Sequence, residues 1–136
     1  MIIDSHEHMM LPTEMQLQMM DAAGIDKTIL FCTAPHPEKA SSLNALETEM
    51  DELYKVLSGS NSIEANIIRQ QKNISELISI IRKHPDRFGG FGSVPLGMSF
   101  NETQDWITDY IISNSLLGIG EFTPGNEQQI LQLDTV

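Results

Sequence analysis

The sequence predicts an α/β protein in which short strands alternate with longer helices. Short apolar runs are separated by stretches whose apolar residues recur at helical spacing, a pattern typical of βα units around a parallel sheet. Residues 27–32 contain Thr-Ile-Leu-Phe, a continuous apolar run expected of a strand that is buried on both faces. With 136 residues, 40% hydrophobic and 20% charged, the chain has the size and composition of one globular domain.

The first half of the chain is predicted to contain two strands and three helices. A strand over 2–5 is followed by a helix over 13–23, which Gly24 ends, and by a second strand over 27–32. Two helices, rather than one, lie between Pro35 and Pro85, because one apolar stripe stops at 58–60 and another begins after it. These stripes run through Leu43, Leu46, Met50, Leu53 and Leu57, and through Ile63, Ile67, Ile74, Leu77, Ile78 and Ile81.

The second half is predicted to add two more strands, each followed by a helix. The third strand spans 88–94, and its glycines at 89, 90 and 92 indicate a close approach of another backbone or a bend. A helix over 101–114, a fourth strand over 118–122 and a helix that opens over 126–133 complete the pattern.

Composition excludes some classes of function and sets the expected compartment. The net charge is −11 and only eight residues are Lys or Arg, which argues against nucleic-acid binding. No stretch approaches the roughly 20 apolar residues of a membrane span, and no basic segment precedes an apolar run at the N-terminus, so we expect no signal peptide. Cys32 is the single cysteine, which excludes an intramolecular disulfide framework and favours a reducing, cytoplasmic location.

Asp4, His6 and His8 form a candidate metal-binding motif at the first strand. Alternate residues of an extended chain point to the same face, so both imidazoles can converge on one ion. Asp4 is the candidate to orient a ligating ring through its other nitrogen. The alternative is that both histidines are surface residues of an N-terminal turn. Their place beside a strand of an α/β pattern favours the metal site, because active sites of such sheets lie at the carboxyl ends of strands.

Glu121 is a second candidate ligand, because it ends the apolar strand Gly118-Ile119-Gly120. A buried carboxylate needs a partner, and a cation at the histidine pair would supply one. The alternative is an exposed acid at a strand end.

Four segments in order resemble the amidohydrolase superfamily, in its amidohydrolase-related (amidohydrolase 2) branch. IDSHEH at 3–8 resembles the Asp-x-His-x-His signature of the first strand. DAAGIDK at 21–27 resembles the following helix-to-strand junction, HPDRF at 84–88 the approach to strand three, and GIGE at 118–121 strand four. The resemblance implies that residues 1–136 are the N-terminal part, about four βα units, of a single (β/α)8 TIM-barrel domain of a metal-dependent hydrolase.

The resemblance also implies a metal centre and a reaction. His6 and His8 match the first-strand ligands and Glu121 the position of a ligand or bridging group, for one or two divalent metals, usually zinc. The expected activity of the parent enzyme is hydrolysis of an amide, ester or related bond of a small molecule by metal-activated water. The alternatives are non-oxidative decarboxylation of an aromatic or unsaturated acid, and a non-catalytic half-barrel assembly unit.

The family's remaining ligands come from strands five and six, with an aspartate from strand eight, and a whole barrel needs about 250 residues. We therefore expect a truncated chain, a proteolytic product or one half of an assembled barrel, inactive alone. A half barrel leaves sheet edges and an apolar face uncovered, which predicts a homo-oligomer.

Several other residues are not expected to take part in chemistry. His36 is interpreted as a solvated loop residue and Cys32 as a buried, inert thiol. Met15, Met19 and Met20 have the spacing of core residues, rather than of a soft-metal site. A solvated helix face is predicted for Glu47, Glu49, Asp51 and Glu52.

Overall fold

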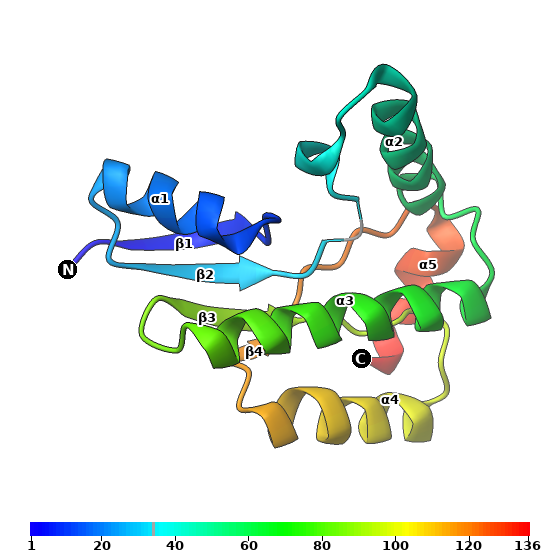
Figure 1. The fold of residues 1–136 in the computed structure, drawn as a ribbon. Helices are drawn as coiled ribbons and strands as arrows, with labels where there is room; N and C mark the ends of the chain where they lie inside the picture. The colour runs from blue at the N-terminus through cyan, green and yellow to red at the C-terminus, as the bar shows by residue number, and fades with distance from the viewer. Residues whose placement is uncertain (34) are drawn as a thin grey trace.

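The computed structural model describes residues 1–33 and 35–136, and a four-stranded parallel sheet runs through them (Figure 1). Its strand order, β1-β2-β3-β4, follows the chain, as successive βα units require. The strands are β1 (Ile3–His8), β2 (Lys27–Phe31), β3 (Phe88–Gly92) and β4 (Gly118–Ile119). The predicted α/β class is therefore confirmed. The first strand extends further than expected, so that His6 and His8 lie on it, and the fourth ends before Glu121.

The helices agree with the predicted pattern, including the two that lie between β2 and β3. They are α1 (Thr13–Ala23), α2 (Leu43–Leu57), α3 (Ile63–Lys83), α4 (Phe100–Trp106) and α5 (Glu127–Leu131). Side chains of Ser42, Ser62, Ser99 and Asn126 accept backbone hydrogen bonds at the N-termini of α2 to α5, so local chemistry fixes where each begins. The helix expected over 101–114 differs, because after Trp106 it continues as a π-helical turn (Ile107–Ile111) and a 3₁₀ turn (Ile112–Asn114).

Two glycines of β3 allow the helices to pack closely on one face of the sheet. A Cβ atom at Gly90 would lie 2.6 Å from Ile81 Cδ1, and one at Gly92 would lie 2.2 Å from Ile111 Cδ1. The sequence predicted a close approach of another backbone or a bend, whereas the groups that lie against these glycines are isoleucine and leucine side chains. The other face of the sheet is less covered, since Phe31 and Phe91 stack there with ring centroids 5.3 Å apart and remain half-buried.

The buried apolar residues form two clusters beneath the helices. The first joins α1, β2, α3 and β3 through Met9, Met20, Leu30, Leu77, Ile80 and Phe88. The second joins α3 to the segment that follows β3, through Ile74, Val94, Met98, Trp106 and Ile111. Met20 is buried as expected, but the prediction for Met19 is wrong, because its side chain is 56% exposed.

Arg87 forms hydrogen bonds that connect segments at the end of the sheet opposite the histidines. Its Nη2 lies 2.8 Å from Asp21 Oδ1 and 3.2 Å from the Ile25 carbonyl, while Nε donates to the Asp26 carbonyl at 3.0 Å. Arg87 therefore ties the approach to β3 to the junction between α1 and β2, two of the four segments that carried the family resemblance. The contacts of Arg87 therefore explain the sequence pattern of these two segments without any role in metal binding.

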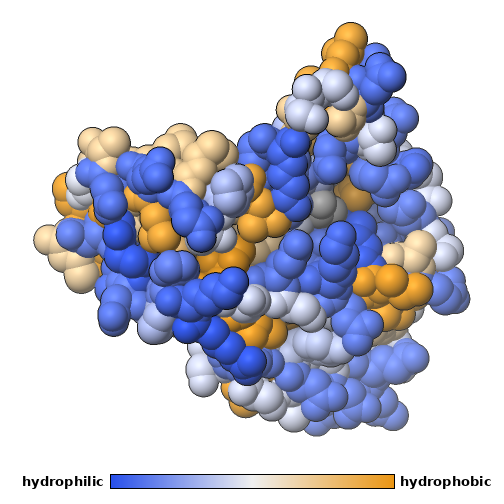
Figure 2. Space-filling view, viewed as in Figure 1, coloured by the Kyte–Doolittle hydropathy of each residue, from blue (hydrophilic) through white to orange (hydrophobic). Residues whose placement is uncertain are grey.

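The surface in Figure 2 is largely hydrophilic, with apolar residues exposed in separate patches. Among the described residues, the helices are all too short or too polar to cross a membrane.

Candidate metal centre

His6, His8 and Glu121 converge, as the sequence predicted. Glu121 Oε2 lies 3.2 Å from His6 Nε2 and 3.6 Å from His8 Nε2. The three residues can each offer a ligand atom within 4.8 Å of the others. β1 and β4 are the two edge strands of the sheet, and in a flat sheet three strand spacings would separate them by about 14 Å. The sheet must therefore curve for a residue after β4 to meet two residues of β1.

The strand and an aromatic neighbour position the two imidazoles. His6 stacks on Phe31 of β2, with ring centroids 4.3 Å apart and planes inclined by 20°. The pairing of β1 with β2 is irregular between Asp4 and Glu7, next to His6. Asp4 does not orient a ring as expected; its Oδ1 accepts a hydrogen bond from the backbone N–H of His6 at 3.2 Å. Asp4 therefore stabilises the backbone at His6 and, among the described residues, makes no contact that orients a ring.

Glu121 follows Gly120, which comes directly after β4. Gly120 has a φ of 148°, a conformation that residues with a Cβ atom rarely adopt, and its N–H donates to the Gly92 carbonyl at 3.0 Å. Of the two alternatives left open for the burial of Glu121, the structure shows the exposed carboxylate, because its side chain is 36% exposed. The side chains of His6 and His8 are also exposed, by 53% and 48%. The three donors thus lie at an open edge that solutes can reach.

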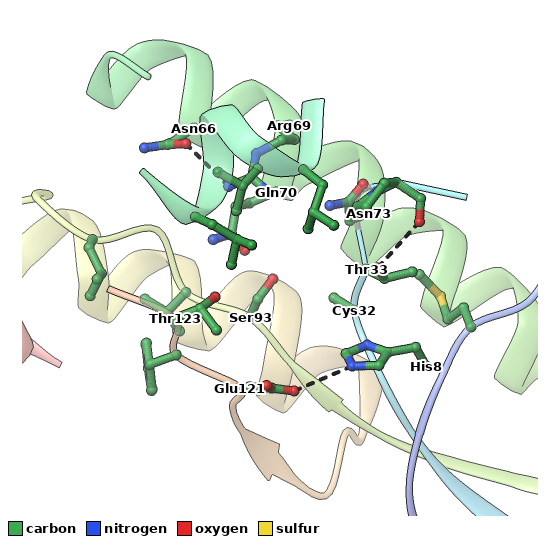
Figure 3. A pocket seen from close by; sticks show the side chains of 18 of the residues that line it. His8, Cys32, Thr33, Asn66, Arg69, Gln70, Asn73, Ser93, Glu121 and Thr123 are labelled. Carbon is green, nitrogen blue, oxygen red and sulfur yellow. Dashed lines mark hydrogen bonds and ion pairs between the residues drawn. The ribbon is translucent and has the colours of Figure 1, made fainter. Parts of the chain in front are cut away.

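A cavity of about 450 Å³ begins at His8 and Glu121 and extends toward α3 (Figure 3). Polar side chains of α3 form the wall away from Glu121, and they are Asn66, Arg69, Gln70 and Asn73. Cys32 and Ser93 lie between the two sides. Burial raises the pKa of the Cys32 thiol and outweighs the hydrogen bonds with Ser93 that lower it, which agrees with an inert thiol.

His36 is not the solvated loop residue that was expected. It is 5% exposed, and its Nδ1 lies 2.9 Å from Glu38 Oε1. Its backbone N–H donates to Glu49 Oε2 at 2.8 Å, so the prediction of a solvated face is wrong for Glu49. Glu76 Oε2 lies 3.5 Å from His36 Nε2. His36 and its three carboxylates join the segment after β2 to α2 and α3, beside the cavity that Glu38 also lines.

Sequence reasoning missed the polar wall of the cavity. Residues 66, 69, 70 and 73 recur at the spacing of one helical face, beside the apolar stripe that was recognised. The four polar residues lie together on one face of the helix, and this polar face was the available sequence signal for the cavity wall. Polar helix faces are usually solvated, so the signal did not by itself identify a cavity.

Comparison with known proteins yields structural similarity alone. No family model matches the chain, and no curated protein matches it. Among solved structures, 2,6-dihydroxybenzoate decarboxylase from Rhizobium is similar with a TM-score of 0.56 and 17% identity. 5-Carboxyvanillate decarboxylase from Novosphingobium aromaticivorans, solved with bound manganese, gives 0.53 and 18%. A Staphylococcus aureus protein with a proposed amidohydrolase classification gives 0.52 and 17%.

These matches cover 98% of this chain but 46%, 47% and 43% of the respective solved chains. The chain thus spans less than half the length of the structures that it resembles. The predicted fold is confirmed: four parallel strands alternate with helices and correspond to roughly the first half of TIM-barrel chains of the amidohydrolase fold.

Proposed function

We propose that His6, His8 and Glu121 hold a divalent metal ion at the carboxyl ends of the strands. The observation that carries the proposal is their convergence within 4.8 Å, although His6 and His8 lie on one edge strand and Glu121 follows the other. Two imidazole nitrogens and one carboxylate oxygen suit zinc and other borderline divalent metals, and three protein ligands leave a position open for substrate. Zinc is the metal expected from these donors, and manganese is bound in the 5-carboxyvanillate decarboxylase structure.

We propose further that this site serves the non-oxidative decarboxylation of a small aromatic acid, in a barrel of which this chain is the N-terminal part. Two of the similar structures are decarboxylases named for benzoate-type acids, which favours this reaction over hydrolysis. In the reaction the bond from ring carbon to carboxylate breaks, its electron pair stays on the ring carbon, and a proton takes the place of carbon dioxide. The metal would supply positive charge that draws electron density from the oxygen atoms of the acid.

The residues of this chain hold and enclose the substrate. The cavity of about 450 Å³ is in the usual size range of small-molecule sites, so an aromatic acid can lie between the metal ligands and α3. His6 is held by its stack on Phe31, which fixes the ring plane from which Nε2 faces Glu121. These contacts would preorganise the ligand set before metal binds.

Hydrolysis of an amide or ester remains the second candidate function. The similarity to the Staphylococcus aureus protein of proposed amidohydrolase class favours it. Water would then attack the carbonyl carbon, the bond from that carbon to nitrogen or oxygen would break, and the leaving amine or alcohol would take up a proton from the water. A metal held by His6, His8 and Glu121 would supply the charge that makes this water more acidic.

Ligand relaxation measured by NMR tests the proposed function without requiring turnover. The protein is loaded with Mn²⁺ and mixed with 2,6-dihydroxybenzoate, whose ring protons relax faster when the acid binds near the paramagnetic ion. We expect faster relaxation with the wild type and with the control His84→Ala, whose histidine lies at the end of α3. The double variant His6→Ala/His8→Ala should abolish the effect.

Equal relaxation in the double variant would contradict the proposed site. Release of carbon dioxide from the acid, measured on the same samples, would support decarboxylation. Cleavage of p-nitrophenyl acetate that requires His6 and His8, without release of carbon dioxide, would favour hydrolysis instead.

A further inference from the structure

Arg69 places a positive charge in the wall of the cavity that lies away from Glu121. It belongs to α3, and Figure 3 shows it beside Asn66 and Gln70. Its Nη2 donates to Asn66 Oδ1 at 3.2 Å, whereas its Nε is buried and has no hydrogen-bond partner among the residues that the structure describes. A buried donor without a partner is rare and costly in folded proteins, so it indicates a missing acceptor.

Among the residues that the structure describes, the charge of Arg69 also lacks a close counterion. Within the described ranges 1–33 and 35–136, no carboxylate oxygen lies within 4.0 Å of its guanidinium, in contrast to Arg87, which pairs with Asp21 at 2.8 Å. Glu52 is the acidic residue whose charge acts on Arg69, but its carboxylate is paired with Lys55 at 2.6 Å. Burial lowers the pKa of Arg69, although an arginine remains protonated at neutral pH. A partly desolvated cation of this kind is stabilised by an anion supplied from outside.

The neighbours of Arg69 suit a planar anion. Asn66, Gln70 and Asn73 lie on the same face of α3 and line the same cavity, which gives the guanidinium a surround of amide groups. Asn73 is only 5% exposed. The guanidinium fork matches a carboxylate in a two-point contact, which a lysine could not make.

We propose that Arg69 and the amides of α3 form a carboxylate-binding subsite, so that the ligand of this cavity is an aromatic acid with two acidic groups. One group faces His8 and Glu121, and the other, which is retained, binds Arg69. The inference rests on the proposed function only for the acidic group that faces His8 and Glu121. The group bound by Arg69 is not the one lost, because a strong cation contact with the departing carboxylate would stabilise the ground state more than the transition state.

Calorimetric titration with benzene-1,3-dicarboxylate tests the subsite. The wild type, Arg69→Gln, Arg69→Lys and the control Arg82→Gln are each titrated with the dicarboxylate and, separately, with Mn²⁺. Arg82 lies on the same helix but is exposed and donates to Asn114, outside the cavity. We expect Arg69→Gln to weaken dicarboxylate binding about tenfold to a hundredfold, Arg69→Lys to weaken it less, and Arg82→Gln to leave it unchanged.

The two proposals fail in different ways. Dicarboxylate binding that is equally tight in Arg69→Gln, or absent in a wild type that binds Mn²⁺, would overturn the subsite and leave the metal site standing. Binding of the dicarboxylate that depends on Arg69, in a protein that takes up no Mn²⁺, would support the subsite and refute the proposed function. Circular dichroism of each variant establishes that it is folded, and Arg69→Lys keeps the test valid if the glutamine variant unfolds.

Discussion

Replacing Glu38 with alanine should lower the free energy of unfolding by about 2–6 kcal/mol at pH 7. Glu38 Oε1 accepts the backbone N–H of Leu11 at 2.9 Å and lies 2.9 Å from His36 Nδ1. Removing the carboxylate leaves two poorly solvated donors unpaired, since the His36 side chain is only 6% exposed. Each orphaned donor costs about 1–3 kcal/mol, which gives the range.

The effect of Glu38 should depend on pH in a defined direction. Burial of Glu38 by itself raises its pKa, but hydrogen bonds from the backbone of Leu11 and of Glu38 and from His36 outweigh burial, so the pKa lies below its usual value. A carboxyl whose pKa is lowered by folding contributes stability that is fully present above its unfolded pKa of about 4.3. This contribution is lost as the pH falls through the folded pKa.

Urea denaturation of the wild type, Glu38→Ala and the exposed control Glu47→Ala measures the effect, at pH 7 and at several values below pH 5. Only the Glu38 variant should lose stability at pH 7, and its deficit should shrink in acid. A deficit below about 0.5 kcal/mol at pH 7, or one that grows as the pH falls, would refute the assigned role of the Glu38 contacts.

Three other predictions concern packing, the thiol and association. Gly92→Ala should lower the unfolding free energy by about 1–3 kcal/mol, because the new Cβ would lie 2.2 Å from Ile111 Cδ1; unchanged urea stability would contradict the close packing of β3. Cys32 should react with iodoacetamide at pH 7.5 far more slowly in the native protein than in urea, because burial raises its pKa, and equal rates would show that the thiol is accessible. The open edges at β1 and β4, with Ile3 47% and Leu117 60% exposed, should make the protein a dimer or larger in light scattering. A stable monomer at high dilution would argue against that association.

Much of the fold could be predicted from the sequence, because its elements carry local signals. Strand β2 contains the apolar run that follows Lys27, α2 and α3 have apolar stripes, and serines cap the N-termini of these two helices. The glycines of β3 indicated tight surroundings, but the approach of another backbone that they suggested is made instead by side chains such as Ile81 and Ile111. The end of the fourth helix was less predictable, since the π-helical turn after Trp106 has no simple sequence signature.

The convergence of His6, His8 and Glu121 was predictable, and its surroundings were not. His6 and His8 share a strand face by their spacing alone, and Glu121 ends an apolar strand. The burial of His36, by contrast, depends on Glu38, Glu49 and Glu76, which come from three separate segments. Contacts between distant segments have no local sequence signal, so the sequence could not separate a buried histidine from a solvated one.

A calorimetric titration with Zn²⁺ tests most directly whether His6, His8 and Glu121 form one metal site. The site predicts one ion per chain in the wild type and in the control His84→Ala. It also predicts that the affinity falls by more than about tenfold in Glu121→Gln and by still more in His6→Ala/His8→Ala, because each variant removes ligand atoms from the set. Zinc affinity that stays unchanged in the double-histidine variant would contradict the metal centre.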